Sequence, residues 1–449
     1  MIQVLYFRLL FDEALYNKRE SMERTVNMKK QRLMLLPNVY LTILNTEKFR
    51  TNCLSVNILR PLRQREAAMN ALLPDVLLRG CRMCKSMGEI SAWLDQRYGA
   101  GVQAFVRKKG EVQDIGFFFD YIDERFIASE EKLTKDICDL LGSFLLEPVT
   151  ENGAFRQDYV DGEKINLINS IMAQINDKRS YAAIRLRQEM FADEPYGVSK
   201  NGEKSEVEAI TPMGLYTHYK YVLAHSQIEI IFVGRADGEY LTDCLRNALK
   251  TLPRAVVDPT ATSLGRIPES VREVSETMDI VQGNLVMGFR TGITAADPEY
   301  PALMLFNSIF GGGVTSKLFL NVRERLSLCY YASSGIDQFK GIMLVSSGVD
   351  MDKYERAREE IMSQLELCRN GEITDEEMSA AKSALCSSLR SCNDSLGRME
   401  DFCLGQEIGH YNHTPESLEL AIKQVALDEV KQVAQKLRLD TIFFLRGVV

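Results

Sequence analysis

The second half of this 449-residue chain repeats the first half, and this duplication constrains the fold more than any other feature. Residues 94–123, LDQRYGAGVQAFVRKKGEVQDIGFFFDYID, can be laid over residues 322–350, VRERLSLCYYASSGIDQFKGIMLVSSGVD, with almost no gap. Each stretch predicts a helix end, a strand, a turn and a second strand. The apolar helix predicted at 69–80 is paralleled at 300–313, and the helix at 130–146 is paralleled at 352–368.

Repeats of roughly 200 residues are too long for a solenoid, so they predict two homologous domains. The expected fold class is α+β, each half a mostly antiparallel sheet with helices packed on one side. We expect the halves to be related by pseudo-twofold symmetry, with a cleft between them that could hold a ligand.

Residues 252–270, LPRAVVDPTATSLGRIPES, carry three prolines and little periodicity, which is typical of a linker. The chain is therefore divided into an N-terminal extension (1–34), a first domain (35–250), a linker (251–270) and a second domain (271–449). The extension begins apolar, but Asp12 and Glu13 interrupt it well before the ~18 apolar residues that a membrane span requires.

Composition excludes several classes of function. A net charge of -8 argues against nucleic acid as a partner, because phosphate binding relies on a basic face. The 10 cysteines are scattered, as expected for reduced thiols in the cytoplasm. Cys81 and Cys84 form a C-x2-C pair, but it follows a helix instead of preceding one, so a reactive dithiol is not expected. The 4 histidines include His410 and His413, with no third metal ligand evident nearby.

Three stretches carry a resemblance to a known family: the helix MNALLPDVLLRG (69–80), the glycine run FGGGVTSKLF (310–319) and the motif RERLSLCY (323–330). From about residue 38 to the C-terminus, the chain resembles the insulinase, pitrilysin and mitochondrial processing peptidase family of inverted zinc proteases. It is similar above all to the bacterial non-catalytic, paired-subunit branch, including members associated with modification of elongation factor P.

The resemblance implies that the family's zinc motif is vacant in this chain. The motif H-x-x-E-H places two histidine ligands and a catalytic glutamate on one helix. The corresponding positions hold Ala71, Pro74 and Asp75. In the E-x6-E pair of a later helix, Glu163 matches the first glutamate, whereas the ligand position falls on Ser170. One aspartate cannot hold zinc, so we expect neither a metal nor a catalytic residue in this chain.

A second motif of the family is retained. In R-E-x-x-G-L-x-Y, the arginine and the tyrosine contact the backbone of a bound peptide across the cleft. Arg323 and Tyr330 keep the spacing, although Ser327 replaces the motif glycine. A guanidinium donates to peptide carbonyls, and a phenol donates or accepts. The alternative is that Arg323 forms an ordinary salt bridge and Tyr330 fills core.

The strand at 101–110, GVQAFVRKKG, matches the family's edge strand, to which a substrate adds as an extra strand. This resemblance makes Gln103, Ala104 and Phe105 candidate substrate-binding residues. Lys108 and Lys109 are equally consistent with charges that protect an exposed edge.

Together these features favour a catalytically inactive, peptide-binding subunit that pairs with a zinc-bearing H-x-x-E-H paralogue, with self-pairing as the second possibility. Zinc is expected in the partner and no cofactor in this chain. A peptide substrate is expected, but neither nucleic acid nor membrane, and the location is expected to be cytoplasmic. The main alternative is a non-proteolytic binding or scaffold protein of the same fold. A peptidase with unorthodox metal ligands is the third.

Overall fold

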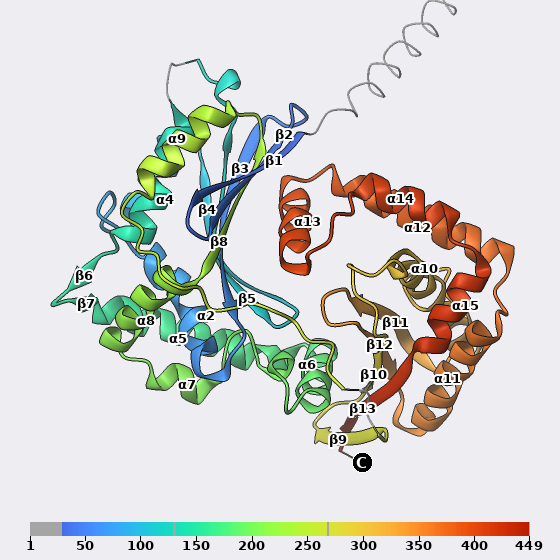
Figure 1. Ribbon diagram of the computed structural model, residues 1–449. Helices are drawn as coiled ribbons and strands as arrows, with labels where there is room; N and C mark the ends of the chain where they lie inside the picture. Colours follow the sequence, from blue (N-terminus) through green and yellow to red (C-terminus); the bar gives the residue numbers. More distant parts are fainter. Residues whose placement is uncertain (1–28, 129–131, 267–268, 449) are drawn as a thin grey trace, which may run out of the picture.

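The computed structural model describes residues 29–128, 132–266 and 269–448. Within these ranges the chain folds into two α+β halves, each built on one large sheet (Figure 1). The expected α+β class is confirmed. Residues 1–28 of the predicted extension lie outside the described ranges. Residues 29–34, by contrast, belong to the first strand, so the first sheet begins before the domain boundary placed at residue 35.

The sheet of the first half has six strands in the order β1-β2-β8-β3-β5-β4. All neighbours are antiparallel except β2 and β8, which are parallel. Two short strands, Thr150–Glu151 and Ala154–Phe155, form a separate hairpin. The strands of the large sheet are β1 (Lys29–Leu36), β2 (Val39–Asn45), β3 (Thr51–Pro61), β4 (Gly101–Lys109), β5 (Val112–Ile122) and β8 (Gln227–Gly234).

The outer face of this sheet packs against helices and encloses a continuous apolar core with them. The alternating side chains of the strands account for this arrangement, because one face of each strand is apolar throughout. The helices of the first half are α2 (Gln64–Leu78), α3 (Met87–Asp95), α4 (Leu133–Leu146), α5 (Gln157–Ala173), α6 (Lys178–Met190), α7 (Lys204–Ala209), α8 (Pro212–His225) and α9 (Gly238–Ala248).

The second half has a five-stranded sheet in the order β11-β12-β10-β13-β9 and a second apolar core. Its strands are β9 (Arg272–Met278), β10 (Gly283–Arg290), β11 (Cys329–Asp337), β12 (Ile342–Val349) and β13 (Arg438–Gly447). Its helices are α10 (Tyr300–Phe310), α11 (Tyr354–Asn370), α12 (Asp375–Cys392), α13 (Leu396–Gly409), α14 (Pro415–Gln424) and α15 (Leu427–Lys436), with a π-helix, η4, at Leu318–Arg325.

The two sheets have the same topology, as the sequence duplication predicts. The order β2-β8-β3-β5-β4 in the first half corresponds to β9-β13-β10-β12-β11 in the second. The single parallel pair falls at the same place, β2 with β8 and β13 with β9. Strands β4 and β11 are therefore equivalent, and both lie at an open edge of their sheet.

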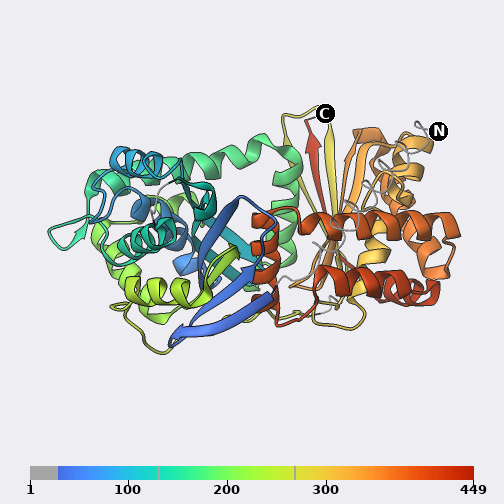
Figure 2. The same ribbon diagram turned by 90° about the horizontal axis from the view of Figure 1, so that it is seen from above.

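Each half also sends one helix to the inner face of the other half's sheet. Helix α6 of the first half packs on β10 and β13, and α13 of the second half packs on β8 and β3 (Figures 1 and 2). The expectation of helices on one side only is thus incomplete. Apolar contacts seal both crossings, as with Leu186 on α6 and Leu404 on α13, which are fully buried.

These crossings cover much of the inner face of each sheet and narrow the space expected between the halves, where a cavity of about 340 Å³ remains between α6 and the strands β11 and β12. Buried charges tie the same interface. Arg107 of β4 donates to Glu400 of α13 at 2.9 Å, and Ser55 of β3 donates to Glu400 at 2.8 Å. Lys340, between β11 and β12, donates to Glu111, between β4 and β5, at 2.6 Å. The two halves therefore form one packed unit.

Among the described residues, no helix combines the length and the apolarity that crossing a bilayer requires.

Candidate functional site

Helix α2 carries the three residues predicted to stand at the zinc-motif positions, and its apolar side chains are packed as ordinary core. The apolar residues recur at helical spacing, and Leu72, Leu73 and Val76 are buried against the sheet. Ala71 has 1% of its surface exposed, and Pro74 is buried within the helix. Two of the three motif positions thus hold small apolar groups that face the protein interior and have no metal-binding atoms.

The remaining polar groups of the motif do not form a metal site. Asp75 is solvent-accessible, yet partial burial and the nearby carboxylate of Glu163 raise its pKa to about 6, against the opposing effect of Arg79. Glu163 is held in an ion pair with the Arg79 guanidinium and accepts a hydrogen bond from Asn166 at 2.9 Å. Ser170 is exposed on α5.

A zinc ion needs several nitrogen, sulfur or carboxylate ligands that converge. The described parts of the chain contain no group of three or more histidine, cysteine, aspartate or glutamate side chains that could hold a metal ion. A cation, the guanidinium of Arg79, already neutralises the family carboxylate Glu163. The residues at this site therefore do not fit zinc.

The other candidate ligands have structural roles. Cys81 and Cys84 are buried free thiols. Burial raises the pKa of Cys84, so less of this thiol is in the reactive thiolate form. His218 is buried and shares a 2.7 Å hydrogen bond with Asn70. Burial lowers the pKa of this histidine to about 4, so it is neutral at physiological pH.

Arg323 and Tyr330 lie on either side of a tight turn that leads from η4 to the edge strand β11. Ser327, at the position of the motif glycine, has a φ of 49°. This is the left-handed region that glycine adopts most easily, so the turn keeps the geometry although the residue has changed. The pairing of β11 with β12 shifts register between Cys329 and Tyr331, which marks Tyr330 as the extra residue of a β-bulge.

The side chains of this pair are accessible. Tyr330 is 61% exposed, and its hydroxyl donates to Asp350 at 3.1 Å. The Arg323 side chain is 41% exposed and lies over the ring of Phe319, with its guanidinium 4.6 Å from the ring centroid. Its ion pair with the adjacent Glu324 spans 3.5 Å. Neither side chain fills core, and neither forms a close buried salt bridge.

Strand β4 lies at the edge of the first sheet, as expected from the sequence. The carbonyl of Val106 accepts from the Lys200 ammonium at 2.7 Å and so points away from β5. Since backbone groups alternate along a strand, those of Ala104 and Val102 face the open edge, while those of Gln103 and Phe105 pair with β5. Of the predicted residues, only Ala104 presents its backbone outward. The sequence analysis missed Val102.

The glycine run covers part of the equivalent edge strand in the second half. The N–H of Ser334 in β11 donates to the carbonyl of Gly311 at 2.9 Å. A Cβ on Gly311 would lie 2.6 Å from the Ser334 nitrogen, so only glycine permits this approach. By the same alternation, the backbone of Ala332 faces the uncovered part of this edge.

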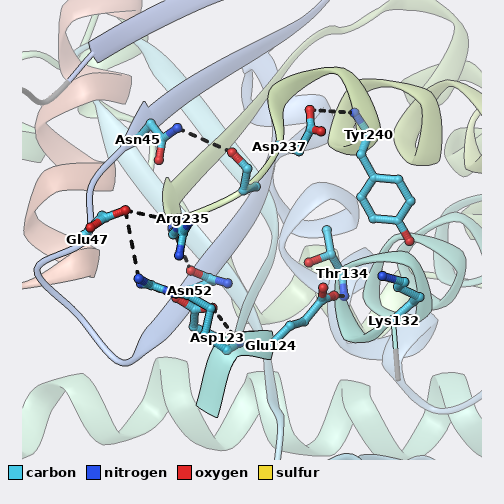
Figure 3. A pocket seen from close by; sticks show the side chains of 12 residues that line it. Asn45, Glu47, Asn52, Asp123, Glu124, Lys132, Thr134, Arg235, Asp237 and Tyr240 are labelled. Atoms are coloured by element: carbon cyan, nitrogen blue, oxygen red, sulfur yellow. Dashed lines mark hydrogen bonds and ion pairs between the residues drawn. The ribbon is translucent and has the colours of Figure 1, made fainter. Parts of the chain in front are cut away.

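A pocket of about 670 Å³ lies elsewhere (Figure 3). It is at the end of the first sheet where β3 begins near Asn52, whereas α2 follows the other end of β3. Its charges pair with one another, as when Arg235 contacts Glu47 at 3.3 Å and Asp237 caps helix α9. This self-paired surface is separate from both motifs.

A second cavity of about 340 Å³ lies between α6 and the strands β11 and β12. It is lined by the basic side chains of Arg179 and Arg187, which the sequence analysis did not single out. Their spacing of eight residues puts them on one face of the helix, a signal that could have been found in the sequence. The cavity lies beside the edge strand that begins next to Tyr330.

Comparisons with known proteins agree with this geometry. The model of a family described as the peptidase M16 inactive domain matches residues 209–385. The chain is 33% identical over 412 residues to the probable inactive metalloprotease YmfF of Bacillus subtilis, covering 90% of this chain and 95% of YmfF. It is 26% identical over 302 residues to an uncharacterized zinc protease of Mycobacterium bovis, covering 65% of this chain and 68% of that protein.

Solved structures share the whole architecture. A conserved protein from Enterococcus faecalis superimposes with a TM-score of 0.87 at 28% identity, covering 93% of this chain and 99% of that one. A peptidase M16 inactive domain from Pseudomonas fluorescens shares the fold with a TM-score of 0.75 at 17% identity, covering 94% of this chain and 99% of that one. The chain therefore belongs to the insulinase-like M16 peptidase family as a non-catalytic member.

Proposed function

We propose that this protein is a non-catalytic subunit that binds an extended peptide and pairs with a zinc-bearing M16 paralogue. The observation that carries the proposal is the exposure of Arg323 and Tyr330 on an edge strand, without buried partners of their own. An arginine with free donors and a phenol at a strand edge suit the carbonyls of an extended chain. A core-filling role would have buried them.

The open edges support the same function. Ala104 and Val102 of β4 offer N–H and C=O groups to which an added strand could bind, and Ala332 offers the same on β11. Lys108 does not extend into solvent as an edge-protecting charge would, because its ammonium donates to the carbonyl of Val198 at 3.2 Å. This favours peptide addition over simple edge protection at that lysine.

A partner is required because the chain keeps groups suited to peptide binding but has no residues that fit zinc. Its inner faces are largely covered by α6 and α13, so we place most of the peptide chamber against a second subunit. We place the zinc and the catalytic residues in that paralogue and assign no cofactor to this chain. Reduced cysteines, all free in the described structure, agree with a cytoplasmic location.

Co-expression with an H-x-x-E-H paralogue and a peptide-cleavage assay test the proposal. Arg323→Ala should lower kcat/KM of the pair by about 10- to 100-fold, for the loss of ~1.4–2.7 kcal/mol of hydrogen bonding to substrate. Arg325→Ala is the matched control, because that exposed arginine lies two residues away and only loosely contacts Glu360, at 3.9 Å. Equal activity of both variants would contradict the proposal.

The second candidate function, a non-proteolytic scaffold of the same fold, is favoured by the packing of α6 and α13 across the two halves. It predicts that the chain recruits no zinc-bearing partner and that Tyr330→Phe leaves all binding unchanged. Pull-down of the paralogue by the purified chain distinguishes the two functions.

A further inference from the structure

The cavity between α6 and β11 exists because small side chains face one another across it. Helix α6 packs on β10 and β13, and its Arg179 side chain reaches Ser333 of the edge strand β11. The facing positions hold Ala183 on α6, Ser333 and Gly335 on β11, and Ser346 on β12. A Cβ placed on Gly335 would meet no atom within 4 Å, which confirms that this space is open.

The charges around the cavity are not balanced. Arg179 donates to the Ser333 hydroxyl at 2.8 Å and lies over the ring of Tyr331. Arg187, half-buried, contacts the carbonyl of Ala183 at 3.4 Å. Within the described ranges, no close ion pair joins either guanidinium to a carboxylate; Asp177 acts on Arg179 at longer range, and Arg187 lies near the Tyr196 hydroxyl. A half-buried guanidinium without an anionic partner is unusual, because removing it from water carries a free-energy cost that a partner normally offsets.

The one carboxylate in the lining is already engaged. Asp337 accepts from the backbone N–H groups of Phe339 and Lys340 at 2.9 and 3.0 Å, and from the Tyr196 hydroxyl at 2.7 Å. It therefore holds the β11–β12 turn and Tyr196 in place. The Lys108 side chain lies behind Tyr196, with its nitrogen 4.2 Å from the ring centroid, and adds no second carboxylate to the lining. The local balance favours an added negative charge.

We propose that this cavity binds a carboxylate of the peptide that the chain holds, through Arg179, Arg187 and the hydroxyl groups of Ser333 and Ser346. The inference rests on the proposed peptide-binding function and adds a substrate preference to it. Ser333 lies three residues along β11 from Tyr330, or roughly 10 Å at the rise of a strand. A peptide at Tyr330 can therefore place a carboxylate a few residues along in the cavity.

Two sources can supply this carboxylate: an acidic side chain or the free C-terminus of the peptide. Fluorescence anisotropy on the full chain separates them with ten-residue, dye-labelled peptides that differ at one group. One peptide carries an internal glutamate and a C-terminal amide, and a second replaces the glutamate by glutamine. A third carries the glutamine with a free C-terminal carboxylate.

The expected result is that one of the two carboxylate peptides binds about tenfold more tightly than the neutral peptide, since charge-assisted, bidentate pairs are the stronger hydrogen bonds. Arg187→Gln should abolish this difference while the neutral peptide binds as before. Arg246→Gln, on an exposed arginine in the last turn of α9, is the matched control and should keep the difference.

Gly335→Leu provides an independent variant, because it fills the cavity and leaves every charge in place. It should also remove the preference for the carboxylate. If all three peptides bind the wild-type chain equally, the carboxylate site is refuted and peptide binding stands. If no peptide binds, the proposed function itself fails, and this inference fails with it.

Discussion

Lys340 provides a quantitative test of the packed interface between the halves. Its side chain has 0% of its surface exposed, and its ammonium uses all three donors. The acceptors are Glu111 at 2.6 Å, Glu194 at 2.6 Å and the carbonyl of Ser263 at 2.7 Å. These groups come from the first half and the linker, whereas Lys340 belongs to the second half.

Lys340→Met keeps most of the apolar stem and removes the charge. Glu194 would retain its contact with Arg290 at 3.2 Å, but Glu111 would keep only the N–H of Ser263 at 3.3 Å. Breaking a buried pair by removing one partner costs about 3–5 kcal/mol, and the remaining contacts place this case near 3 kcal/mol.

Urea unfolding of both proteins at pH 7 measures this loss. The control is Lys353→Met, since Lys353 forms an exposed, solvent-screened pair with Asp350 at 2.9 Å, and we expect its removal to leave the free energy of unfolding nearly unchanged. A loss below 1 kcal/mol for Lys340→Met would show that the halves do not meet as described.

Three further predictions concern single residues. Ser327→Gly should raise the free energy of unfolding by about 0.5–1 kcal/mol in urea, because it relieves a left-handed backbone without burying any group; no gain would refute the assigned turn. Gly311→Val should lower the melting temperature and expose the β11 edge to hydrogen exchange, since its Cβ would meet Ser334; unchanged protection would refute that cover. Burial, and then Arg187, lower the pKa of Lys108 to about 7, with Lys340 acting in the same direction and Asp337 and Glu111 opposing. The unfolded chain then binds the extra proton above pH 7, so stability relative to Lys108→Met should rise between pH 7 and pH 10; a flat difference would contradict this.

The sequence predicted the architecture well because the duplication carried the information. Two copies of one strand and helix pattern imply one sheet topology twice, and the parallel pair recurs at the same place in both sheets. The closed interface could not be predicted in the same way. Whether α6 and α13 pack on their own sheet or cross to the other depends on tertiary packing, and their apolar faces suit either arrangement.

The candidate site was predicted in part for similar reasons. Ala71, Pro74 and Asp75 lie on one helix, as predicted, because a motif fixes its spacing locally; their assignment to the zinc-motif positions stays a prediction. In β4, backbone groups must alternate between facing β5 and facing the open edge, but the sequence does not say which residues face outward. Gln103 and Phe105 were therefore grouped with Ala104. The hydrogen bond from Lys200 to the Val106 carbonyl shows which residues face outward, and it joins residues far apart in the chain. The same distance in sequence hid the cavity that Arg187 and strand β11 line together.

The most direct test of the central proposal measures bound zinc and peptide cleavage in the same samples. The samples are the chain alone and the chain paired with an H-x-x-E-H paralogue. The proposal predicts no stoichiometric zinc and no peptide cleavage for the chain alone. It predicts one zinc for each pair of subunits, with cleavage that falls when Arg323 is changed. One zinc bound to the isolated chain together with peptide hydrolysis, or a pair indifferent to Arg323, would contradict it.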